Sequence, residues 1–259
     1  MVQPSDRQPA LPQTALPQTA LPQPALPQPS PLPPSPRIAA PSGGDRPKVI
    51  FLDAVGTLFG VRGSVGQIYQ AVAQSFGVDA PSDRLNQAFF QEFRAAPPMA
   101  FPHSDPATIP HQEYQWWEAI ARNTFQQAGV LEQFADFPQF FQALYQHFAT
   151  AQPWLIYPDV LPALKGWRSQ GIELGIISNF DSRLYAVLNA LNLSSFFSSV
   201  TISTEVGTAK PNPHLFQASL QKHQIAPHQA WHIGDSHRED YQGAKAVGLR
   251  AIWIRRAVG

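Results

Sequence analysis

The sequence predicts an α/β protein with a central parallel sheet, and three features of the chain lead to this fold class. The apolar run 48–52 has the length and the β-branched and aromatic content of a strand buried on both faces. From residue 158 onward, short apolar runs alternate with helical patterns, which is typical of parallel βαβ units with right-handed crossovers. Between these two parts, residues 61–157 show only helical periodicity.

The first segment, residues 1–46, is dominated by proline. Fourteen of the 27 prolines precede Lys48, many of them in pentapeptide repeats that begin with Leu-Pro-Gln. Proline removes backbone donors and fixes φ, so we expect a disordered or polyproline-II-like tail. The stretch 31–34 is a candidate docking motif, but such short matches are weak and a solvated extension is the preferred interpretation.

Composition limits the classes of partner. The 259 residues include 18 basic and 18 acidic side chains, so no field of one sign indicates nucleic acid or a membrane surface. The chain has no cysteine, which excludes disulfides, a thiolate nucleophile and a cysteine-based zinc site. No apolar run approaches the ~20 residues that span a bilayer, and no signal peptide is evident. We therefore expect a cytoplasmic protein with no nucleic-acid or membrane partner.

The helical patterns between residues 61 and 157 predict a small helical domain inserted between the first strand and the rest of the sheet. The first pattern starts behind a possible Ser64 cap and ends at Gly77, and the second follows Ser82. The third ends before Gly129, and the last covers residues 137–148. Trp116, Trp117 and the phenylalanine pairs lie at helical spacing, which more often indicates packing than a ligand site.

The remaining elements complete the predicted sheet. We expect helices at residues 160–170, 182–191, 213–223 and 239–247, and strands at residues 173–178, 200–203, 230–234 and 251–254. The first strand belongs to the same sheet, so residues 47–60 and 158–259 together form the α/β core.

Polar residues follow the first two of these strands. Asp53 comes directly after the first strand, before a turn marked by Gly56 and Thr57, and Ser178 and Asn179 end the second. The carboxyl ends of parallel strands meet at one edge of an open sheet, where ligands collect. A hydroxyl and an amide suit an anionic oxygen because both can donate hydrogen bonds.

The next two strands bring a cation and two more carboxylates to this edge. Lys210 stands before two prolines at a helix entrance, where an ammonium can neutralise a phosphoryl group. Asp235 and Asp240 follow the fourth strand, and hard oxygen ligands of this kind suit Mg²⁺. Each signal is weak by itself, and their order and spacing carry the argument.

These four stretches, taken in order, resemble the four motifs of the haloacid dehalogenase superfamily. The likeness runs from Lys48 to Arg255 and includes a helical cap between the first and second motifs. Within the superfamily, the sequence is most similar to the group named haloacid dehalogenase-like hydrolase domain-containing protein three. That closer likeness is carried by Gln115-Trp116-Trp117, by the stretch 178–184, by His232-Ile233-Gly234-Asp235 and by the stretch 240–243.

The resemblance implies a Rossmann-like parallel sheet and a two-step transfer in which Asp53 is the nucleophile and water releases an aspartyl intermediate. For a phosphate substrate it implies Mg²⁺, a catalytic role for Lys210 and oxygen binding around the second motif. The implied metal ligands are Asp53, the backbone carbonyl of Val55, Asp235 and the nearby Asp240. The implied phosphate-binding residues are Ser178, Asn179 and Lys210.

Val55 departs from the pattern of the superfamily's phosphatases, which carry a second aspartate at this position to protonate the leaving group. Valine transfers no proton, and general acid–base help is typically worth ~10²–10⁴ in rate. The favoured hypothesis is a Mg²⁺-dependent phosphohydrolase that acts on a small substrate, such as one with a good leaving group. The alternatives are a catalytically weak binding or regulatory protein that keeps the fold, and a 2-haloacid dehalogenase.

Several histidines lie near the end of the chain, and we interpret them as incidental. None forms an i, i+4 pair on an expected helix, as the ligands of a zinc-binding helix do. They are His214, His223, His228, His232 and His237. His237 is a remote candidate for the missing proton donor.

Overall fold

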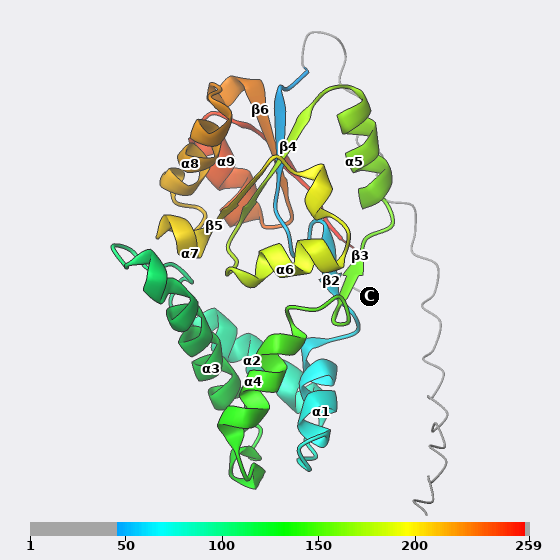
Figure 1. Ribbon diagram of the computed structural model, residues 1–259, viewed down its shortest axis with the longest axis vertical. Helices are drawn as coiled ribbons and strands as arrows, with labels where there is room; N and C mark the ends of the chain where they lie inside the picture. Colours follow the sequence, from blue (N-terminus) through cyan, green and yellow to red (C-terminus); the bar gives the residue numbers. More distant parts are fainter. Residues whose placement is uncertain (1–45, 257–259) are drawn as a thin grey trace, which may run out of the picture. The chain divides into compact units, whose positions relative to one another are not determined.

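A computed structural model describes residues 46–256, which all fall in one compact unit. The predicted tail up to residue 45 lies outside the described residues. The core is a five-stranded sheet in the order β5-β4-β1-β6-β7 (Figure 1). Its strands are β1 (Val49–Leu52), β4 (Glu173–Ser178), β5 (Ser199–Ile202), β6 (Ala230–Gly234) and β7 (Arg250–Trp253).

Every pairing in this sheet is parallel, which confirms the predicted fold class. β1 occupies the centre, where Val49 lies opposite Glu173 of β4 and Ala230 of β6. All four β1 residues are buried, as expected for a strand covered on both faces.

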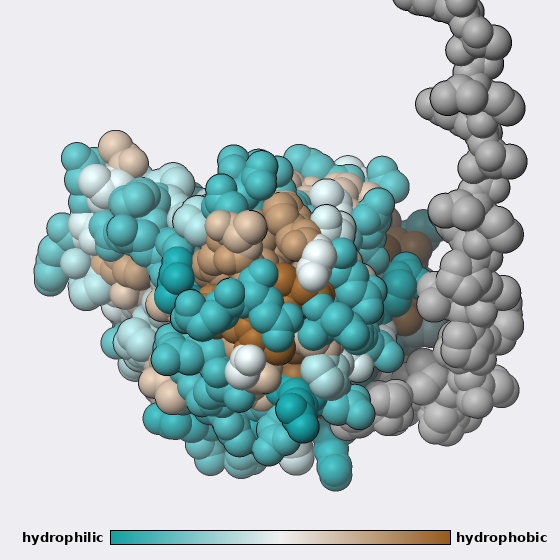
Figure 2. All heavy atoms as spheres, turned by 90° about the horizontal axis from the view of Figure 1, so that it is seen from below, coloured by the Kyte–Doolittle hydropathy of each residue, from teal (hydrophilic) through white to brown (hydrophobic). Residues whose placement is uncertain are grey.

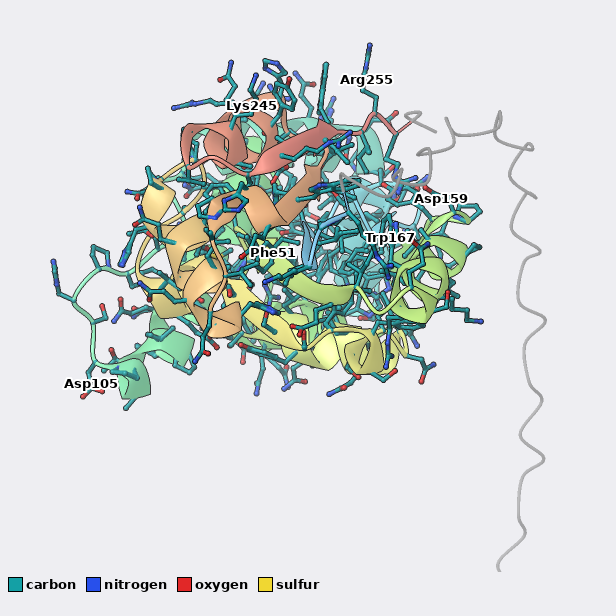
Figure 3. The ribbon with its side chains drawn as sticks, turned by 90° about the horizontal axis from the view of Figure 1, so that it is seen from above. Phe51, Asp105, Asp159, Trp167, Lys245 and Arg255 are labelled. Carbon is teal, nitrogen blue, oxygen red and sulfur yellow. The ribbon has the colours of Figure 1, made fainter. Side chains whose placement is uncertain are left out.

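Helices cover both faces of the sheet, and the alternation of side chains along β1 divides the core between them. Ile50 and Leu52 pack with the helices of one face, and Val49 and Phe51 with those of the other. The first face carries α5 (Val160–Ser169) and α6 (Arg183–Ala190), and the second carries α8 (Pro213–His223) and α9 (Gly243–Ala246). Figure 3 shows Phe51 at the centre of the core, while Lys245, Arg255 and Asp105 lie at the periphery.

A helical insert follows β1 and has its own apolar core. We define it as α1 (Val65–Gln74), α2 (Ser82–Ala95), α3 (Ile109–Gln127) and α4 (Phe137–His147). Ser64 closes a capping box with Gln67 at the start of α1, as its position in the sequence predicts. Of the aromatic residues predicted to pack, Phe140 does so against Phe125, with ring centroids 5.0 Å apart, whereas Phe89, Phe90, Trp117 and Phe141 also line a cavity. Figure 2 shows the end of the insert, where apolar residues gather at the centre of a hydrophilic surround.

A two-stranded antiparallel ribbon, absent from the sequence prediction, joins the insert to the core. It pairs β2 (Phe59–Val61) with β3 (Trp154–Ile156), so that Phe59 lies opposite Ile156. The ribbon thus ties together the two places where the chain passes between core and insert. Strands of three residues leave no periodic signal, which explains the omission.

The other elements differ from the prediction in detail. The expected helix at residues 239–247 is a π-helical turn, η5 (His237–Gln242), that leads into α9. A short helix, α7 (Ser203–Val206), follows β5. The short 3-10 turns are η1 (Pro106–Thr108), η2 (Leu131–Gln133), η3 (Ser194–Phe196) and η4 (Pro227–Gln229). None of the helices within residues 46–256 is both long and apolar enough to cross a membrane.

Candidate active site

The structure brings the predicted site residues together at the carboxyl edge of the sheet. Asp53 follows β1, Ser178 is the last residue of β4, and Asp235 follows β6. Their backbones are fixed by the sheet, since the Asp53 N–H donates to the Ile233 carbonyl at 2.9 Å. Lys210 reaches the same edge from the loop between α7 and α8.

The Lys210 ammonium is the centre of this cluster. Nζ lies 2.6 Å from Oδ1 of Asp53 and 2.6 Å from Oδ1 of Asp240. It also donates to the Ile177 carbonyl at 3.0 Å, so three acceptors surround it. Lys210 is only 4% exposed, and a cation this deeply buried requires such compensation.

Asp240 is held by groups on both of its oxygens. Oδ1 also contacts Nε2 of His232 at 2.9 Å, and Oδ2 accepts from the Ser236 N–H at 3.0 Å. Asp240 therefore positions Lys210. The interpretation of His232 as incidental is wrong, because its fully buried ring contacts this carboxylate. Its place inside an apolar strand, two residues before Gly234, was the available signal.

The two polar residues that end β4 have different surroundings. The Ser178 hydroxyl donates to Oδ1 of Asp53 at 3.0 Å. Asn179 hydrogen-bonds to the backbone of Lys210 and not to Asp53. Its Oδ1 accepts from the Lys210 N–H at 2.7 Å, and its Nδ2 donates to the Lys210 carbonyl at 3.1 Å. The same Nδ2 also donates to Glu239 at 3.2 Å. Asn179 thus fixes the loop that carries the ammonium.

Burial and charge shift the pKa values of this cluster in opposite directions. Burial raises the pKa of Asp53 to about 6, even though Lys210 acts to lower it. Burial raises the pKa of Asp235 as well, with Asp240 adding to the effect. Burial also disfavours ionised Asp240, but Lys210 and His232 outweigh it and hold the Asp240 pKa below its usual range. The two carboxylates raise the Lys210 pKa against the effect of burial.

The donor set fits a hard divalent cation. Asp53, Asp235 and Asp240 each offer a carboxylate oxygen, and these oxygens lie within 4.8 Å of one another. Gly56 keeps space beside them: at its φ of +88° an added Cβ would stand 2.4 Å from Oδ2 of Asp235. Oxygen ligands and an excess of negative charge are what Mg²⁺ prefers.

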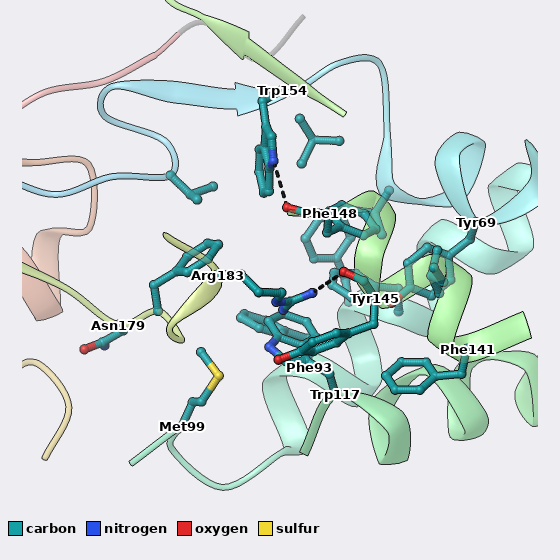
Figure 4. Close-up of a pocket in the computed structure, with 17 residues that line it drawn as sticks. Tyr69, Phe93, Met99, Trp117, Phe141, Tyr145, Phe148, Trp154, Asn179 and Arg183 are labelled. Carbon is teal, nitrogen blue, oxygen red and sulfur yellow. Dashed lines mark hydrogen bonds between the residues drawn. The ribbon is translucent and has the colours of Figure 1, made fainter. Parts of the chain in front are cut away.

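A cavity of about 250 Å³ lies between this site and the helical insert. Val55 and Asn179 line it from the core, next to Asp53 and Ser178 in the sequence. Figure 4 shows aromatic rings around it, and most of these rings belong to the insert. The aromatic members of this wall are Tyr69, Phe89, Phe90, Phe93, Trp117, Phe141, Tyr145, Phe148, Trp154 and Phe180.

Two polar contacts join the insert to the core beside this cavity. The first is made by Glu113 of α3, which is fully buried. It accepts from the Ser182 N–H at 3.0 Å and from the Thr204 hydroxyl at 2.6 Å, and it also bonds the Ser182 hydroxyl. Burial raises the pKa of Glu113, although these hydrogen bonds oppose the rise.

The second contact is centred on Arg183. Its guanidinium donates to Asp181 at 2.8 Å and 2.6 Å and to the Tyr145 carbonyl at 3.2 Å. It also lies over the Tyr145 ring, 3.8 Å from the centroid. Nε1 of Trp117 donates to Asp181 at 2.6 Å. The residues that carry the closer sequence resemblance include Trp117, Asp181 and Arg183. Part of that resemblance therefore lies in the contacts that join the insert to the core.

Comparison with known proteins identifies the family. The family model of haloacid dehalogenase-like hydrolases matches residues 47–248. The mouse protein named haloacid dehalogenase-like hydrolase domain-containing protein 3 is 35% identical over 207 residues, covering 80% of this chain and 81% of that protein. Its bovine counterpart is 33% identical over 209 residues, with the same coverage. The resemblance expected from the motifs is confirmed.

Phosphatases are also among the similar proteins. A glyceraldehyde 3-phosphate phosphatase from Methanopyrus kandleri is 36% identical over 110 residues, covering 42% of this chain and 46% of that protein. The crystal structure of a phosphatase of this family from Thermococcus onnurineus has a TM-score of 0.56 at 23% identity, covering 82% of this chain and 88% of that one. The structure of the L-2-haloacid dehalogenase from Xanthobacter autotrophicus has a TM-score of 0.57 at 19% identity and covers 82% of this chain and 78% of that one. The fold alone therefore does not separate phosphatases from dehalogenases. The chain belongs to the haloacid dehalogenase-like hydrolase family and is a hydrolase with phosphatases among its relatives.

Proposed function

We propose that the protein is a Mg²⁺-dependent phosphohydrolase that acts on a small phosphorylated substrate through an aspartyl-phosphate on Asp53. The observation that carries the proposal is the placement of Lys210 between Asp53 and Asp240, with Asp235 beside them. A buried carboxylate, a fixed ammonium and spare hard oxygen ligands are the parts that phosphoryl transfer requires.

Asp53 is oriented for attack by contacts on one oxygen. Ser178 and Lys210 both donate to Oδ1. Among the described residues no hydrogen bond engages Oδ2, so the two oxygens can divide the roles of nucleophile and metal ligand. With a pKa of about 6, Asp53 is largely ionised at neutral pH, as a carboxylate nucleophile must be.

The phosphoryl oxygens would be bound by Lys210 and Ser178, which already stand at the nucleophile. Asp53, Asp235 and the Val55 carbonyl would hold Mg²⁺, with Asp240 adjacent. The ion would neutralise charge on the phosphoryl oxygens when bound. Asp240 and His232 keep Lys210 aimed at Asp53 throughout.

The helical insert would act as the cap over the substrate. Its aromatic residues form the far wall of the cavity that Val55 and Asn179 line from the core, and such a wall would exclude water from the reacting groups. Glu113 and Arg183 hold the cap on the core. The cap therefore sets which substrate body can stand next to the phosphoryl group.

Val55 supports a second candidate function, that of a binding or regulatory protein of low catalytic power. Without a proton donor there, a phosphate ester of an alkyl alcohol should turn over slowly. A dehalogenase is less well supported. The cation of the cavity wall, Arg183, is already paired with Asp181 and is not free to bind a haloacid carboxylate.

Hydrolysis of acetyl phosphate and phenyl phosphate, with and without Mg²⁺, tests the proposal. We expect turnover that requires Mg²⁺ and is lost in Asp53→Asn, while the exposed control Asp79→Asn retains it. Absence of Mg²⁺-dependent turnover in the folded native chain would favour the binding protein. Halide release from 2-haloacids without metal would establish the dehalogenase.

A further inference from the structure

Building on the proposed function, we infer that the substrate is the phosphate monoester of a small, uncharged phenol, whose ring occupies the aromatic cavity while its phosphate meets Asp53. Two independent observations lead to this substrate class. One is the shape and chemistry of the cavity, and the other is the missing proton donor at Val55.

The cavity is the space that the body of a substrate has to enter. Val55 lies two residues after Asp53, and Asn179 directly follows Ser178, so two of the lining residues adjoin the phosphate-binding groups. On the side of the insert the cavity is lined by Phe93 and Tyr145, among other rings (Figure 4). A group attached to a phosphate at Asp53 would therefore lie against these rings.

The lining side chains offer little to a charged or hydroxyl-rich body. The polar side chains at its core end, Asn179 and Arg183, are engaged: Asn179 bonds the Lys210 backbone and Glu239, and Arg183 bonds Asp181 and the Tyr145 carbonyl. The hydroxyls of the lining belong to Tyr69 and Tyr145, so a sugar or a carboxylate in this space would lose most of its hydration and gain few partners, which is unfavourable. An aromatic ring would instead gain edge and face contacts with the surrounding rings.

The size of the cavity limits the body to about one ring. An apolar cavity of ~150 Å³ accepts benzene. The cavity here has about 250 Å³, which leaves room for one ring with a short substituent and not for a nucleoside or a disaccharide.

The leaving group provides the second argument. A phenol has a pKa near ~10, as in tyrosine, and can depart as the phenolate without a proton from the enzyme. In the first step a carboxylate oxygen of Asp53 forms a bond to phosphorus, the bond from phosphorus to the aryl oxygen breaks, and the electron pair leaves on that oxygen, which takes a proton from water. In the second step water attacks phosphorus, the bond to Asp53 breaks, and inorganic phosphate and one proton are released. Valine at position 55 suffices for the first step, because the phenolate leaves without a proton from the enzyme.

A series of para-substituted phenyl phosphates tests the inference, with acetyl phosphate as a probe that does not need the cavity. We expect kcat/KM for 4-methylphenyl phosphate to exceed that for phenyl phosphate by roughly threefold, the effect of burying one methyl group. We expect 4-carboxyphenyl phosphate to fall at least ~10-fold below phenyl phosphate, because its charge would be buried without a partner.

A charge-adding variant makes the test specific for the cavity wall. Phe93 is 42% exposed on α2 and lines the cavity, so Phe93→Lys should fold and place a cation beside the ring. In this variant the kcat/KM values for 4-carboxyphenyl phosphate and 4-methylphenyl phosphate should differ by no more than about threefold. Gln91→Lys adds the same charge to an exposed position of α2 outside the lining and should leave the native preference unchanged.

Ligand binding supplies a readout apart from turnover. We expect 4-methylphenol to raise the thermal midpoint of the native protein and 4-hydroxybenzoate to leave it unchanged. If acetyl phosphate is hydrolysed but the substituents have no effect or charged rings are preferred, the inference is overturned while the proposed function stands. If neither acetyl nor aryl phosphates are hydrolysed, the proposed function fails and the inference with it, even if 4-methylphenol binds.

Discussion

Replacing Val55 by aspartate should convert the protein into a better phosphatase for alkyl esters. Val55 is partly exposed, lines the cavity and stands two residues after Asp53, so a carboxyl group there would face the leaving group. The apolar wall should raise the pKa of the new carboxyl, which keeps it protonated as an acid. The Val55→Asp variant therefore supplies the one function that the site lacks.

The size of the gain follows from the role of the acid. General acid help is typically worth ~10²–10⁴, and an unoptimised donor should give ~10-fold or more in kcat/KM for alkyl phosphates. Acetyl phosphate, whose leaving group needs no proton, should change by less than about twofold. Val55 packs against the main apolar cluster of the core, so the variant should also lose about 1–2 kcal/mol of unfolding free energy.

The matched control is Val55→Asn, which has nearly the same shape as the aspartate variant and no acidic proton. It should show the same stability loss in urea denaturation and no gain on alkyl phosphates. If Val55→Asp folds, binds Mg²⁺ and still treats alkyl and acetyl phosphates alike, or if Val55→Asn shows the same gain, the proton-donor reasoning is wrong.

Three further predictions concern the joint and the buried cluster. Burial raises the pKa of Glu113, so the native protein loses stability as this carboxyl ionises above pH 4.5. The Glu113→Gln variant has no such group, and its thermal midpoint should rise relative to that of the native protein as the pH increases. Parallel curves of thermal midpoint against pH would contradict this. Trp117→Phe should lower the free energy of unfolding by about 1–3 kcal/mol, because it removes the hydrogen bond from Trp117 to buried Asp181. Trp116→Phe should lower it by less than about 1 kcal/mol, because Nε1 of Trp116 donates to a backbone carbonyl. Equal losses in urea denaturation would refute this distinction. Lys210→Met should lower the free energy of unfolding by about 3–5 kcal/mol, because the buried carboxylates of Asp53 and Asp240 lose their counterion. A loss below about 1 kcal/mol in urea denaturation would show that these ion pairs do not stabilise the fold.

Most of the core could be predicted because its signals are local. Strands β4 and β6 and helix α8 have the predicted bounds, since β-branched runs and a proline at a helix start mark them directly. The convergence of Asp53, Ser178 and Lys210 could also be predicted, because parallel strands bring their carboxyl ends to one edge.

The parts that escaped prediction depend on contacts between distant residues. The β2–β3 ribbon pairs segments about ninety residues apart, and neither has a pattern of its own. The role of His232 follows from its contact with Asp240 across a strand and a turn, which no spacing rule describes. Glu113 meets Ser182 and Thr204 only after the insert has packed on the core, so a polar residue in a helical pattern gave no sign of its burial.

The central claim is that Asp53 becomes phosphorylated during turnover. The direct measurement is to mix the native protein with Mg²⁺ and acetyl phosphate, quench with acid within the first turnover, and map the phosphoryl group by mass spectrometry. The account predicts that the label lies on the peptide that contains Asp53, that it disappears as inorganic phosphate forms, and that Asp53→Asn carries none. Turnover without a covalent intermediate, or a label that persists in Asp53→Asn, would contradict it.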